Sequence, residues 1–392
     1  MAAKAAADRW VDHRCHRDGC VCVGFDTCCA HASRASRQLR GARESLVGQS
    51  DARLGHACAA VGTTQRFLGR TGVRVSPLAL GTMSFGGDAD ASTAARLFAM
   101  ARERGVNLFD CADVYNGGRS EQLLGELVRP CRDEVVITTK AYFPTGSDGN
   151  ARGSSRYHLV RAVEASLRRL GTDRIDVFFL HRFDDVTPLE ETLRAVEHLV
   201  ARGMVLYPAV SNFAAWQTAQ AIGIAQRHGW QPIACVQPMY NLAKRQAEVE
   251  ILPMCAGLGL GALTYSPLGG GLLSGKYGVN ARPERGRLVD VAMYRERYGS
   301  PIHFEIAERF TAFAAARGLD PVPLAIAWVA AHPAVTAPII GARDPEQLSR
   351  CLAALDLTVD PAMWAEIAAL SPTPPPATDR NEESTATNYG SR

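Results

Sequence analysis

The sequence of 392 residues contains no long hydrophobic run, although hydrophobic residues make up 47% of it. A membrane-spanning helix needs roughly 18 or more consecutive apolar residues, and no stretch approaches that length. The partly apolar segment 20–30 is interrupted by Asp26, which argues against a secretory signal peptide. We therefore expect a globular protein with a sizeable core and no membrane segment.

The sequence also lacks an excess of one charge beyond its first 62 residues. Those residues hold 9 of the 43 Lys and Arg residues and 6 of the 40 Asp and Glu residues, which leaves 34 of each sign in the remainder. A nucleic-acid-binding surface requires clustered basic residues in excess. The balance therefore indicates that the main part of the chain binds no nucleic acid.

The 11 cysteines do not have the spacing of a disulfide framework or of a zinc site. Six of them lie in the first 62 residues, and the other five are scattered singly. Cys15, His16, Cys20 and Cys22 are close together, but they match no common zinc pattern. Scattered thiols are typical of a reducing compartment, so we expect no metal and a cytoplasmic location.

The two ends of the chain have compositions that do not favour a fold. Residues 1–62 show no sustained helical or strand period, and we interpret them as a disordered extension or as sequence upstream of the functional product. An Arg-rich targeting peptide is the alternative, but the six acidic residues argue against it. Residues 371–392 contain too little apolar material to fold, and we expect a disordered tail there.

From Arg66 to about residue 370, short apolar runs alternate with amphipathic segments. The segment RFLGRTGVRVS predicts a hairpin with its turn at residues 70–72. The predicted strands that follow are 78–80, 107–110, 134–139, 175–180, 205–210, 233–236, 260–264 and 335–340. The predicted helices between and after them are 93–104, 120–128, 155–170, 188–201, 214–228, 246–256 and 345–354, with an added helix at 361–370.

Eight strand–helix units predict an α/β protein whose parallel strands close into a (β/α)8 TIM barrel over residues 63–370. The strands are continuous apolar runs such as VVITT and DVFFL, as expected when helices cover a parallel sheet. One strand, 205–210, contains Pro208, which cannot donate a ladder hydrogen bond. We expect this strand to be distorted or to begin late.

Four polar residues stand at or just beyond the ends of three consecutive predicted strands. Asp110 and Tyr115 follow the strand that ends in LFD, Lys140 ends VVITTK, and His181 ends IDVFFLH. In a parallel barrel, the carboxyl ends of the strands meet at the functional face. A carboxylate, a phenol, an ammonium and an imidazole that meet there can protonate a carbonyl oxygen.

Tyr115 is the natural proton donor of this group. A free phenol has a pKa of about 10, and a neighbouring ammonium lowers it, so we expect Lys140 to lower the pKa of Tyr115. Asp110 would keep Lys140 protonated, and His181 would orient the substrate oxygen. No side chain donates a hydride, so a nicotinamide cofactor is implied.

Each of these residues also has a simple structural interpretation. An Asp near a strand end is usually a cap, a lone Tyr is usually packing, and a lysine can be a solvated strand terminus. A histidine beside an apolar run is often part of the core. Complementary groups at three successive strand ends favour the catalytic interpretation over four unrelated structural roles.

At this level of detail the chain resembles the aldo-keto reductase superfamily, in particular bacterial members that are similar to potassium-channel β-subunits. The resemblance is carried by RFLGRTGVRVSPLALGTMSFGG, LFDCADVYNGGRSEQLLGE, VVITTK, DVFFLHR, SNF, TYSPLGGGLLSGKY and APIIGARDPEQL, in this order from residue 66 to about 356. It implies a catalytic tetrad of Asp110, Tyr115, Lys140 and His181. It also implies direct, metal-free hydride transfer from NADPH to a small carbonyl substrate, with Tyr115 as general acid and base.

The same resemblance implies a set of cofactor-binding residues. Thr82 and Met83 would lie near the nicotinamide, Tyr265 would stack on it, and Arg343 would pair with a 2′-phosphate, which favours NADP over NAD. The other implied contacts are Ser211, Asn212 and Gln237 for the carboxamide, Ser266, Leu268, Gly271 and Lys276 for the phosphates, and Gly341 and Gln347 for the adenosine.

One feature departs from the reductase pattern, and another matches the phosphate loop of an NTPase. Arg350 and Cys351 stand where many relatives have Glu and Asn against the adenine, so the adenine contacts differ here. The residues from Gly270 to Lys276 match a G-x-x-x-x-G-K phosphate loop, but Tyr277 replaces the Ser or Thr that would bind Mg²⁺. We therefore do not expect an NTPase.

Two other functions remain open at this stage. Some barrels of this superfamily bind NADPH as regulatory subunits with slow or no turnover, and Lys140 could instead form a Schiff base. Substrate choice depends on the loops 142–156, 183–187 and 278–302. The last loop contains Arg282, Arg285, Arg287 and Arg295, which suit an anionic or sugar substrate as well as a solvated loop. The sequence does not determine the oligomeric state.

Overall fold

The short apolar runs form the eight parallel strands of a closed barrel in the computed structural model, which describes residues 64–385. Each strand pairs with its successor, and β10 closes the barrel by pairing with both β9 and β3. The strands are β3 (Ala79–Gly81), β4 (Leu108–Asp110), β5 (Val136–Ala141), β6 (Ile175–Leu180), β7 (Val205–Ser211), β8 (Cys235–Gln237), β9 (Gly261–Thr264) and β10 (Ala337–Ile340). The predicted TIM barrel is confirmed.

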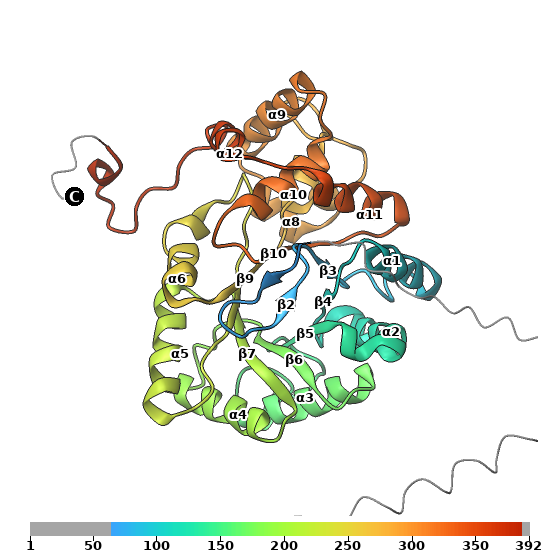
Figure 1. Cartoon of the computed structure of the whole chain (residues 1–392), viewed down its shortest axis with the longest axis vertical. Coiled ribbons are helices and arrows are strands. Elements are labelled where there is room, and N and C mark those ends of the chain that lie inside the picture. Colours follow the sequence, from blue (N-terminus) through green and yellow to red (C-terminus); the bar gives the residue numbers. More distant parts are fainter. Residues whose placement is uncertain (1–63, 386–392) are drawn as a thin grey trace, which may run out of the picture. The chain divides into compact units, whose positions relative to one another are not determined.

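Helices surround the strands on the outside (Figure 1). The helices are α1 (Ala91–Glu103), α2 (Arg119–Val128), α3 (Arg156–Leu170), α4 (Leu189–Ala201), α5 (Ala215–His228), α6 (Ile251–Leu258), α7 (Arg287–Asp290), α8 (Ala292–Tyr298), α9 (Pro301–Ala316), α10 (Pro321–Ala331), α11 (Pro345–Leu352) and α12 (Pro361–Ala368). The predicted helix 246–256 is divided, because residues Gln246–Glu248 form a 3-10 turn and α6 begins only at Ile251.

Local sequence signals set where these helices begin and end. Asp90 caps α1 by accepting a hydrogen bond from Thr93 N (2.7 Å), and Ser155 caps α3 in the same way through His158 N. α3 ends at Gly171, whose φ of 62° lies in the left-handed region that glycine tolerates best. These caps place the helix–strand loops at the two rims of the barrel.

Two apolar clusters hold the barrel together. The larger cluster lies between the strands and the surrounding helices, and the smaller one fills the barrel interior, where Val177, Phe179 and Leu263 meet. The hairpin of β1 (Arg66–Phe67) and β2 (Arg74–Val75) contributes Leu68 to the interior cluster, which confirms the predicted hairpin. Leu68 leaves room only for glycine at Gly261, where a Cβ atom would lie 2.6 Å from Leu68 Cδ1.

The expectation that Pro208 delays or distorts its strand is wrong. β7 begins at Val205 and pairs with β6 on both sides of the proline, with Pro208 opposite Phe178. The carbonyl of Pro208 accepts a hydrogen bond from Ala234 N (2.9 Å). The ladder with β8 starts only at Cys235, opposite Ala209, so the missing N–H of Pro208 lies before the point where that ladder needs a donor.

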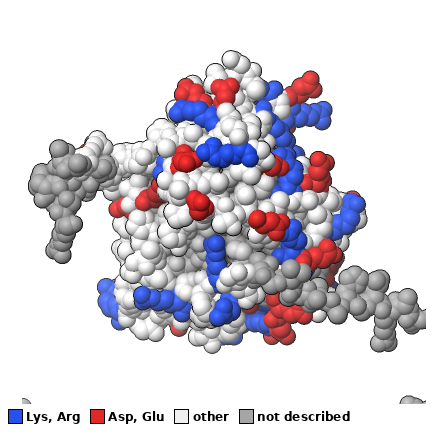
Figure 2. Space-filling view, turned by 45° about the horizontal axis from the view of Figure 1, so that its top comes forward, with Lys and Arg blue, Asp and Glu red and all other residues white. Residues whose placement is uncertain are grey.

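The prediction for residues 1–62 falls outside the described residues. Of the predicted tail, the structure describes residues 371–385, which include a 3-10 turn at Asn381–Ser384. Between residues 64 and 385 no single helix is long and apolar enough to cross a membrane; only α9 and α10 together, bent by 103°, reach that length and composition. Figure 2 shows basic and acidic side chains interspersed over the visible face, without a continuous basic patch.

We expect Gly125→Ala to destabilise the barrel. Gly125 lies in α2, where a Cβ atom would come within 2.2 Å of the backbone oxygen of Leu170 at the end of α3. The two helices must separate to admit it, at a cost on the order of 1–3 kcal/mol of unfolding free energy in urea titrations.

The matched control is Gly223→Ala in α5, where a Cβ atom would meet nothing within 4 Å. That variant should be as stable as the wild type or more stable by up to about 1 kcal/mol, because alanine favours helix. Equal stability of the two variants would contradict the close packing of α2 against α3.

Candidate active site

A cleft of about 570 Å³ opens at the carboxyl ends of the strands. Three of the four predicted catalytic residues, Asp110, Tyr115 and His181, line it, and the fourth, Lys140, is fully buried beneath it. β4, β5 and β6 place these residues because each strand ends at the same rim of the barrel. The structure thus brings the predicted tetrad together.

Lys140 and Asp110 form a buried ion pair at the floor of the cleft. Lys140 Nζ donates to both carboxylate oxygens of Asp110 (2.8 and 2.7 Å) and to the backbone oxygen of Cys111 (2.6 Å). Asp110 also accepts from Thr138 Oγ1 (2.6 Å) and Gln237 Nε2 (2.8 Å). Burial by itself lowers the pKa of Lys140, but the Asp110 carboxylate and Tyr115 raise it above its ordinary value, so the amine stays charged.

Tyr115 stands above this pair, with Lys140 Nζ 5.3 Å from the centroid of its ring. Burial raises the pKa of Tyr115 to about 12, although the nearby Lys140 charge acts in the opposite direction. Lys140 acts on this pKa in the expected direction, but desolvation of the phenolate outweighs the attraction of the ammonium, so the net shift is upward. The phenol keeps its proton at neutral pH and can donate it.

His181 faces Tyr115 across the cleft, with ring centroids 6.3 Å apart at 77°. Burial and the Lys140 charge lower the pKa of His181 to about 3, so the imidazole is neutral. Its Nδ1 atom is buried and has no hydrogen-bond partner among the described residues. The Phe143 ring packs edge-on against the imidazole, with ring centroids 4.8 Å apart.

Asn116 and Thr82 hold the loops around Tyr115, in ways that the sequence pattern did not predict. Asn116 adopts a left-handed conformation (φ 49°), and its Nδ2 atom donates to the backbone oxygens of Met83 and Phe85 (both 2.8 Å). Thr82 is buried behind the cleft, where its hydroxyl donates to the Asp110 backbone oxygen (3.1 Å). Thr82 therefore supports the loop rather than lining the cleft.

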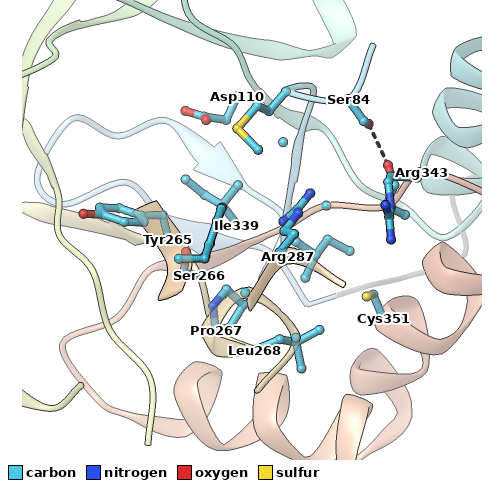
Figure 3. A pocket seen from close by; sticks show the side chains of 18 of the residues that line it. Ser84, Asp110, Tyr265, Ser266, Pro267, Leu268, Arg287, Ile339, Arg343 and Cys351 are labelled. Carbon is cyan, nitrogen blue, oxygen red and sulfur yellow. Dashed lines mark hydrogen bonds between the residues drawn. The ribbon is translucent and has the colours of Figure 1, made fainter. Parts of the chain in front are cut away.

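The other predicted cofactor residues line the same cleft as the tetrad. These are Met83, Ser211, Asn212, Gln237, Tyr265, Ser266, Leu268, Gly271, Lys276, Gly341, Arg343 and Gln347. They lie at or beyond the ends of five different strands, far apart in sequence. Figure 3 shows Tyr265, Ser266, Pro267 and Leu268 along one wall and Arg343 toward the other end. Ser84 Oγ donates to the Ala342 backbone oxygen (2.6 Å) and ties two of these loops together (Figure 3).

Tyr265 is coupled to the catalytic end of the cleft. Its hydroxyl donates to Asn212 Oδ1 (2.7 Å), and Asn212 Nδ2 donates to the backbone oxygen of His181 (2.9 Å). Asn212 and Ser266 both have positive φ angles, 56° and 59°, which are uncommon for residues other than glycine. Such strained positions cluster at functional sites, where the surrounding structure holds them.

A glycine-rich turn forms the next part of the wall. Gly269, Gly270 and Gly271 all lie in the left-handed region, with φ of 59°, 69° and 100°. A Cβ atom at Gly271 would meet nothing within 4 Å, so the backbone here borders open space. The Lys276 side chain follows this turn and also lines the cleft. A phosphate group fits such a surface of exposed backbone and positive charge.

The two arginines at the Gly341 end of the cleft have different partners. Arg350 forms a fork with Asp320 (2.8 and 2.7 Å), whereas the closest carboxylate oxygen to Arg343 is in Asp88 at 3.9 Å. The buried Cys351 lies beside Arg350 on α11. Arg343 is thus the more available of the two for an anionic ligand.

The structure also separates the arginines of the loop 278–302. Arg282 bonds to backbone oxygens and lies 3.5 Å from the Phe304 ring centroid, and Arg295 bonds to the Val289 backbone oxygen. Arg285 and Arg287 line the cleft, and Figure 3 shows the Arg287 side chain in it. The lining residues that the sequence pattern did not single out include Ser84 and Arg182, and also Phe143, Met293, Tyr294 and Arg297, which lie in the loops 142–156 and 278–302 expected to govern substrate choice. They lie on irregular loops or a short helix, where no hydrophobic period reveals them.

Asp113, two residues before Tyr115, is a buried carboxylate that the sequence analysis also missed. Neither of its carboxylate oxygens accepts a hydrogen bond within residues 64–385. Burial and the nearby Glu121 carboxylate raise the pKa of Asp113 to about 7. Glu121 is itself buried and bonds to Thr139 Oγ1 (2.6 Å) and Arg169 Nε (2.7 Å). The carboxyl group of Asp113 therefore changes charge near neutral pH.

Comparisons with known proteins agree with this arrangement. The model of the "Aldo/keto reductase family" matches residues 77–372. The chain is 38% identical over 306 residues to "Uncharacterized oxidoreductase YrpG" of Bacillus subtilis, covering 75% of this chain and 91% of that protein. It is also 35% identical over 298 residues to a "Probable voltage-gated potassium channel subunit beta" of Arabidopsis thaliana, covering 74% of this chain and 90% of the other.

We expect Asp113→Asn to change how stability depends on pH. Between about pH 4 and pH 7 the folded protein holds a proton on Asp113 that the unfolded chain releases, so the wild type loses stability as the pH rises through this window. The variant lacks this loss, so its unfolding free energy relative to wild type should rise by on the order of 3 kcal/mol between pH 5 and pH 8.

Urea unfolding at several pH values measures this difference, with the exposed Asp185→Asn as control. The amide at residue 113 has its own constant cost, so only the slope with pH is informative. A difference between variant and wild type that stays constant from pH 5 to pH 8 would exclude the titration of Asp113 in this range.

Proposed function

Since this chain belongs to the aldo/keto reductase family, we propose that it reduces an aldehyde or ketone to the alcohol with NADPH as cofactor. The observation that carries this proposal is the buried Lys140–Asp110 pair beneath Tyr115, with neutral His181 across the same cleft. No structural role requires these four groups to converge on an open cavity. Their combined chemistry is the delivery of one proton to a carbonyl oxygen.

Tyr115 acts as the general acid. It holds its proton at neutral pH because burial keeps its pKa high. When the proton leaves, the Lys140 ammonium stabilises the phenolate, and Asp110 keeps that ammonium charged and in place. Positioned proton donors of this kind contribute roughly 10²–10⁴ in rate. His181, as a neutral imidazole, donates a hydrogen bond to the carbonyl oxygen and orients it toward Tyr115.

The residues of the cleft fit a phosphorylated dinucleotide. The volume of the cleft, about 570 Å³, lies within the range usual for ligand sites, and the wall of the cleft contains exposed glycine backbone beside cationic side chains. When bound, the nicotinamide supplies the hydride that the carbonyl carbon accepts. Ser211, Asn212 and Gln237 hold the carboxamide, and Tyr265 provides an aromatic face for the ring.

The cationic side chains divide between the phosphates. Lys276, Arg285 and Arg287 bind the diphosphate, beside the backbone of Ser266, Leu268 and Gly271. Arg343 binds the 2′-phosphate. Its guanidinium is exposed, and its nearest carboxylate oxygen, in Asp88, is 3.9 Å away, which is too long for a hydrogen bond. Gly341 and Gln347 border the adenosine. This division makes NADPH the preferred cofactor over NADH.

A second candidate function is a regulatory subunit that binds NADPH and turns over slowly. The Arabidopsis relative and a rice relative, 36% identical over 308 residues, both carry the name "Probable voltage-gated potassium channel subunit beta". The complete set of proton-transfer groups favours catalysis. Retention of NADPH by the purified protein, with no reduction of any aldehyde in a broad panel, would favour the regulatory function.

A Schiff-base mechanism at Lys140 is disfavoured by the geometry. A nucleophilic lysine must be neutral and must reach the substrate. Lys140 is fully buried, donates to Asp110 and Cys111, and has a raised pKa. The amine is therefore held as an ammonium beneath the cleft.

We expect Tyr115→Phe to lower the turnover number by roughly 10²–10⁴, because the ring remains but its proton is lost. The dissociation constant for NADPH, measured by fluorescence titration, should stay within about twofold of wild type, since the phenol forms no part of the cofactor site. The exposed Tyr157→Phe serves as control. Wild-type turnover in the Tyr115 variant would refute the role of this phenol.

We expect Arg343→Ala to weaken NADPH binding by about tenfold or more, because a charge-assisted fork to the 2′-phosphate is lost. NADH lacks that phosphate, so its dissociation constant should change little. Arg309→Ala, at an exposed pair with Glu305 on α9, should alter neither value. Equal weakening of the two cofactors would show that Arg343 does not read the 2′-phosphate.

A further inference from the structure

The cleft has a surplus of positive charge. Its only lining carboxylate among the described residues is Asp110, which the buried Lys140 neutralises. Arg343 and Arg350 face Asp88 and Asp320. Five further cations line the cleft and lie within ion-pair distance of no carboxylate in the described part of the chain: Arg182, Lys276, Arg285, Arg287 and Arg297. Unpaired cations that share a cleft repel one another, so their clustering indicates anionic ligands.

The proposed cofactor accounts for only part of this surplus. A 2′-phosphorylated dinucleotide carries roughly four negative charges, two on the diphosphate and up to two on the monoester. Lys276, Arg285, Arg287 and Arg343 suffice to match them. Arg182 and Arg297 remain without an anion.

Arg297 lies on α8 and lines the cleft. Arg287 and Arg297 both lie near the Tyr294 ring, with their guanidinium carbons 5.7 and 5.5 Å from its centroid. Burial raises the pKa of Tyr265, and the Arg297 charge acts against that rise, which agrees with a guanidinium on the Tyr265 side of the cleft. That hydroxyl bonds to Asn212, which in turn bonds to the backbone of His181.

Arg182 lines the cleft beside a catalytic residue. It directly follows His181, its side chain is exposed, and it lines the same cleft. A substrate whose carbonyl lies between Tyr115 and His181 therefore shares the cavity with two guanidinium groups that have no carboxylate partner among the described residues; that of Arg297 contacts only the Met293 sulfur (3.7 Å) and the Tyr294 ring. Guanidinium groups bind carboxylate and phosphate in charge-assisted, often bidentate, geometry.

We propose that the substrate carries an anionic group, a carboxylate or a phosphate, in addition to its carbonyl, and that Arg297 together with Arg182 binds this group. The proposal rests on the proposed carbonyl reduction, and it names the substrate class. Arg297 is here a specificity residue: it selects the substrate and does not take part in proton transfer.

Paired aldehydes test this directly in the NADPH-loaded enzyme. The pairs are 4-formylbenzoate against its neutral methyl ester, and 4-formylphenyl phosphate against 4-methoxybenzaldehyde. The anionic member should have a kcat/KM about tenfold or more above its neutral partner, mainly through a lower KM, because binding at a fork remote from the carbonyl acts on ground and transition states alike. The larger of the two preferences identifies carboxylate or phosphate as the group recognised.

Arg297→Ala should remove this preference. We expect its kcat/KM for the anionic aldehyde to fall by about tenfold or more, with the value for the neutral partner within about twofold of wild type. Arg295→Ala is the matched control, because Arg295 lies on the same helix but bonds to the Val289 backbone oxygen and does not line the cleft. That variant should reduce both aldehydes as the wild type does.

Binding of the alcohol 4-(hydroxymethyl)benzoate to the NADPH-loaded protein gives a second readout that needs no turnover. Calorimetry should show a dissociation constant raised about tenfold in Arg297→Ala and unchanged in Arg295→Ala. Equal kcat/KM for the charged and neutral aldehydes, or equal losses of both in Arg297→Ala, would overturn the proposal. If neither aldehyde is reduced, the carbonyl reduction itself is contradicted, and the calorimetric comparison still decides whether Arg297 binds the anion.

Discussion

The buried ion pair between Lys140 and Asp110 is the interaction on which the rest of the site depends. An ammonium and a carboxylate cannot be buried separately without a large desolvation cost, so each requires the other and further hydrogen bonds. Thr138, Gln237 and the Cys111 backbone supply these bonds. The groups come from β4, β5 and β8 and from the residue after β4, so the barrel must be closed before the pair is satisfied. The arrangement of the proton-transfer groups therefore depends on the closed barrel.

Burial also sets the protonation states around this pair, in opposite directions for different groups. It raises the pKa of Tyr115 to about 12 and lowers that of His181 to about 3, so both are neutral at pH 7. Lys140 keeps its positive charge, because the Asp110 carboxylate compensates for the loss of water. One neutral acid, one neutral hydrogen-bond donor and one fixed positive charge form a set suited to protonating a carbonyl oxygen. The same burial at Asp113, which lacks a hydrogen-bond partner among residues 64–385, leaves a carboxyl group that titrates near neutrality.

The charge of the cleft has a different origin from its proton chemistry. The tetrad lies at strand ends, where the backbone ladder holds it, whereas the arginines lie on the segment from Arg285 to Arg297 and at Arg182, beyond the strands. Residues on loops can vary without disturbing the barrel, which is why one scaffold serves many substrates. In this chain the loops concentrate cations on a cleft whose floor is already neutral. Under the proposed function, substrate selection and proton transfer belong to separate parts of the structure.

The sequence by itself determined the barrel, the hairpin and the four polar residues at strand ends, because a parallel strand buried on both faces must be a continuous apolar run and its end must meet its neighbours' ends. The tertiary structure decided what depends on distance and burial across elements. It placed Thr82 behind the cleft and brought Gln237 within hydrogen-bond distance of Asp110. Arg282 and Arg295 bond to backbone oxygens, whereas Arg297 lines the cavity. The tertiary structure also decided the net pKa shift of Tyr115, in which burial outweighs the expected effect of Lys140, since desolvation depends on how deeply a group lies among atoms that are remote in sequence.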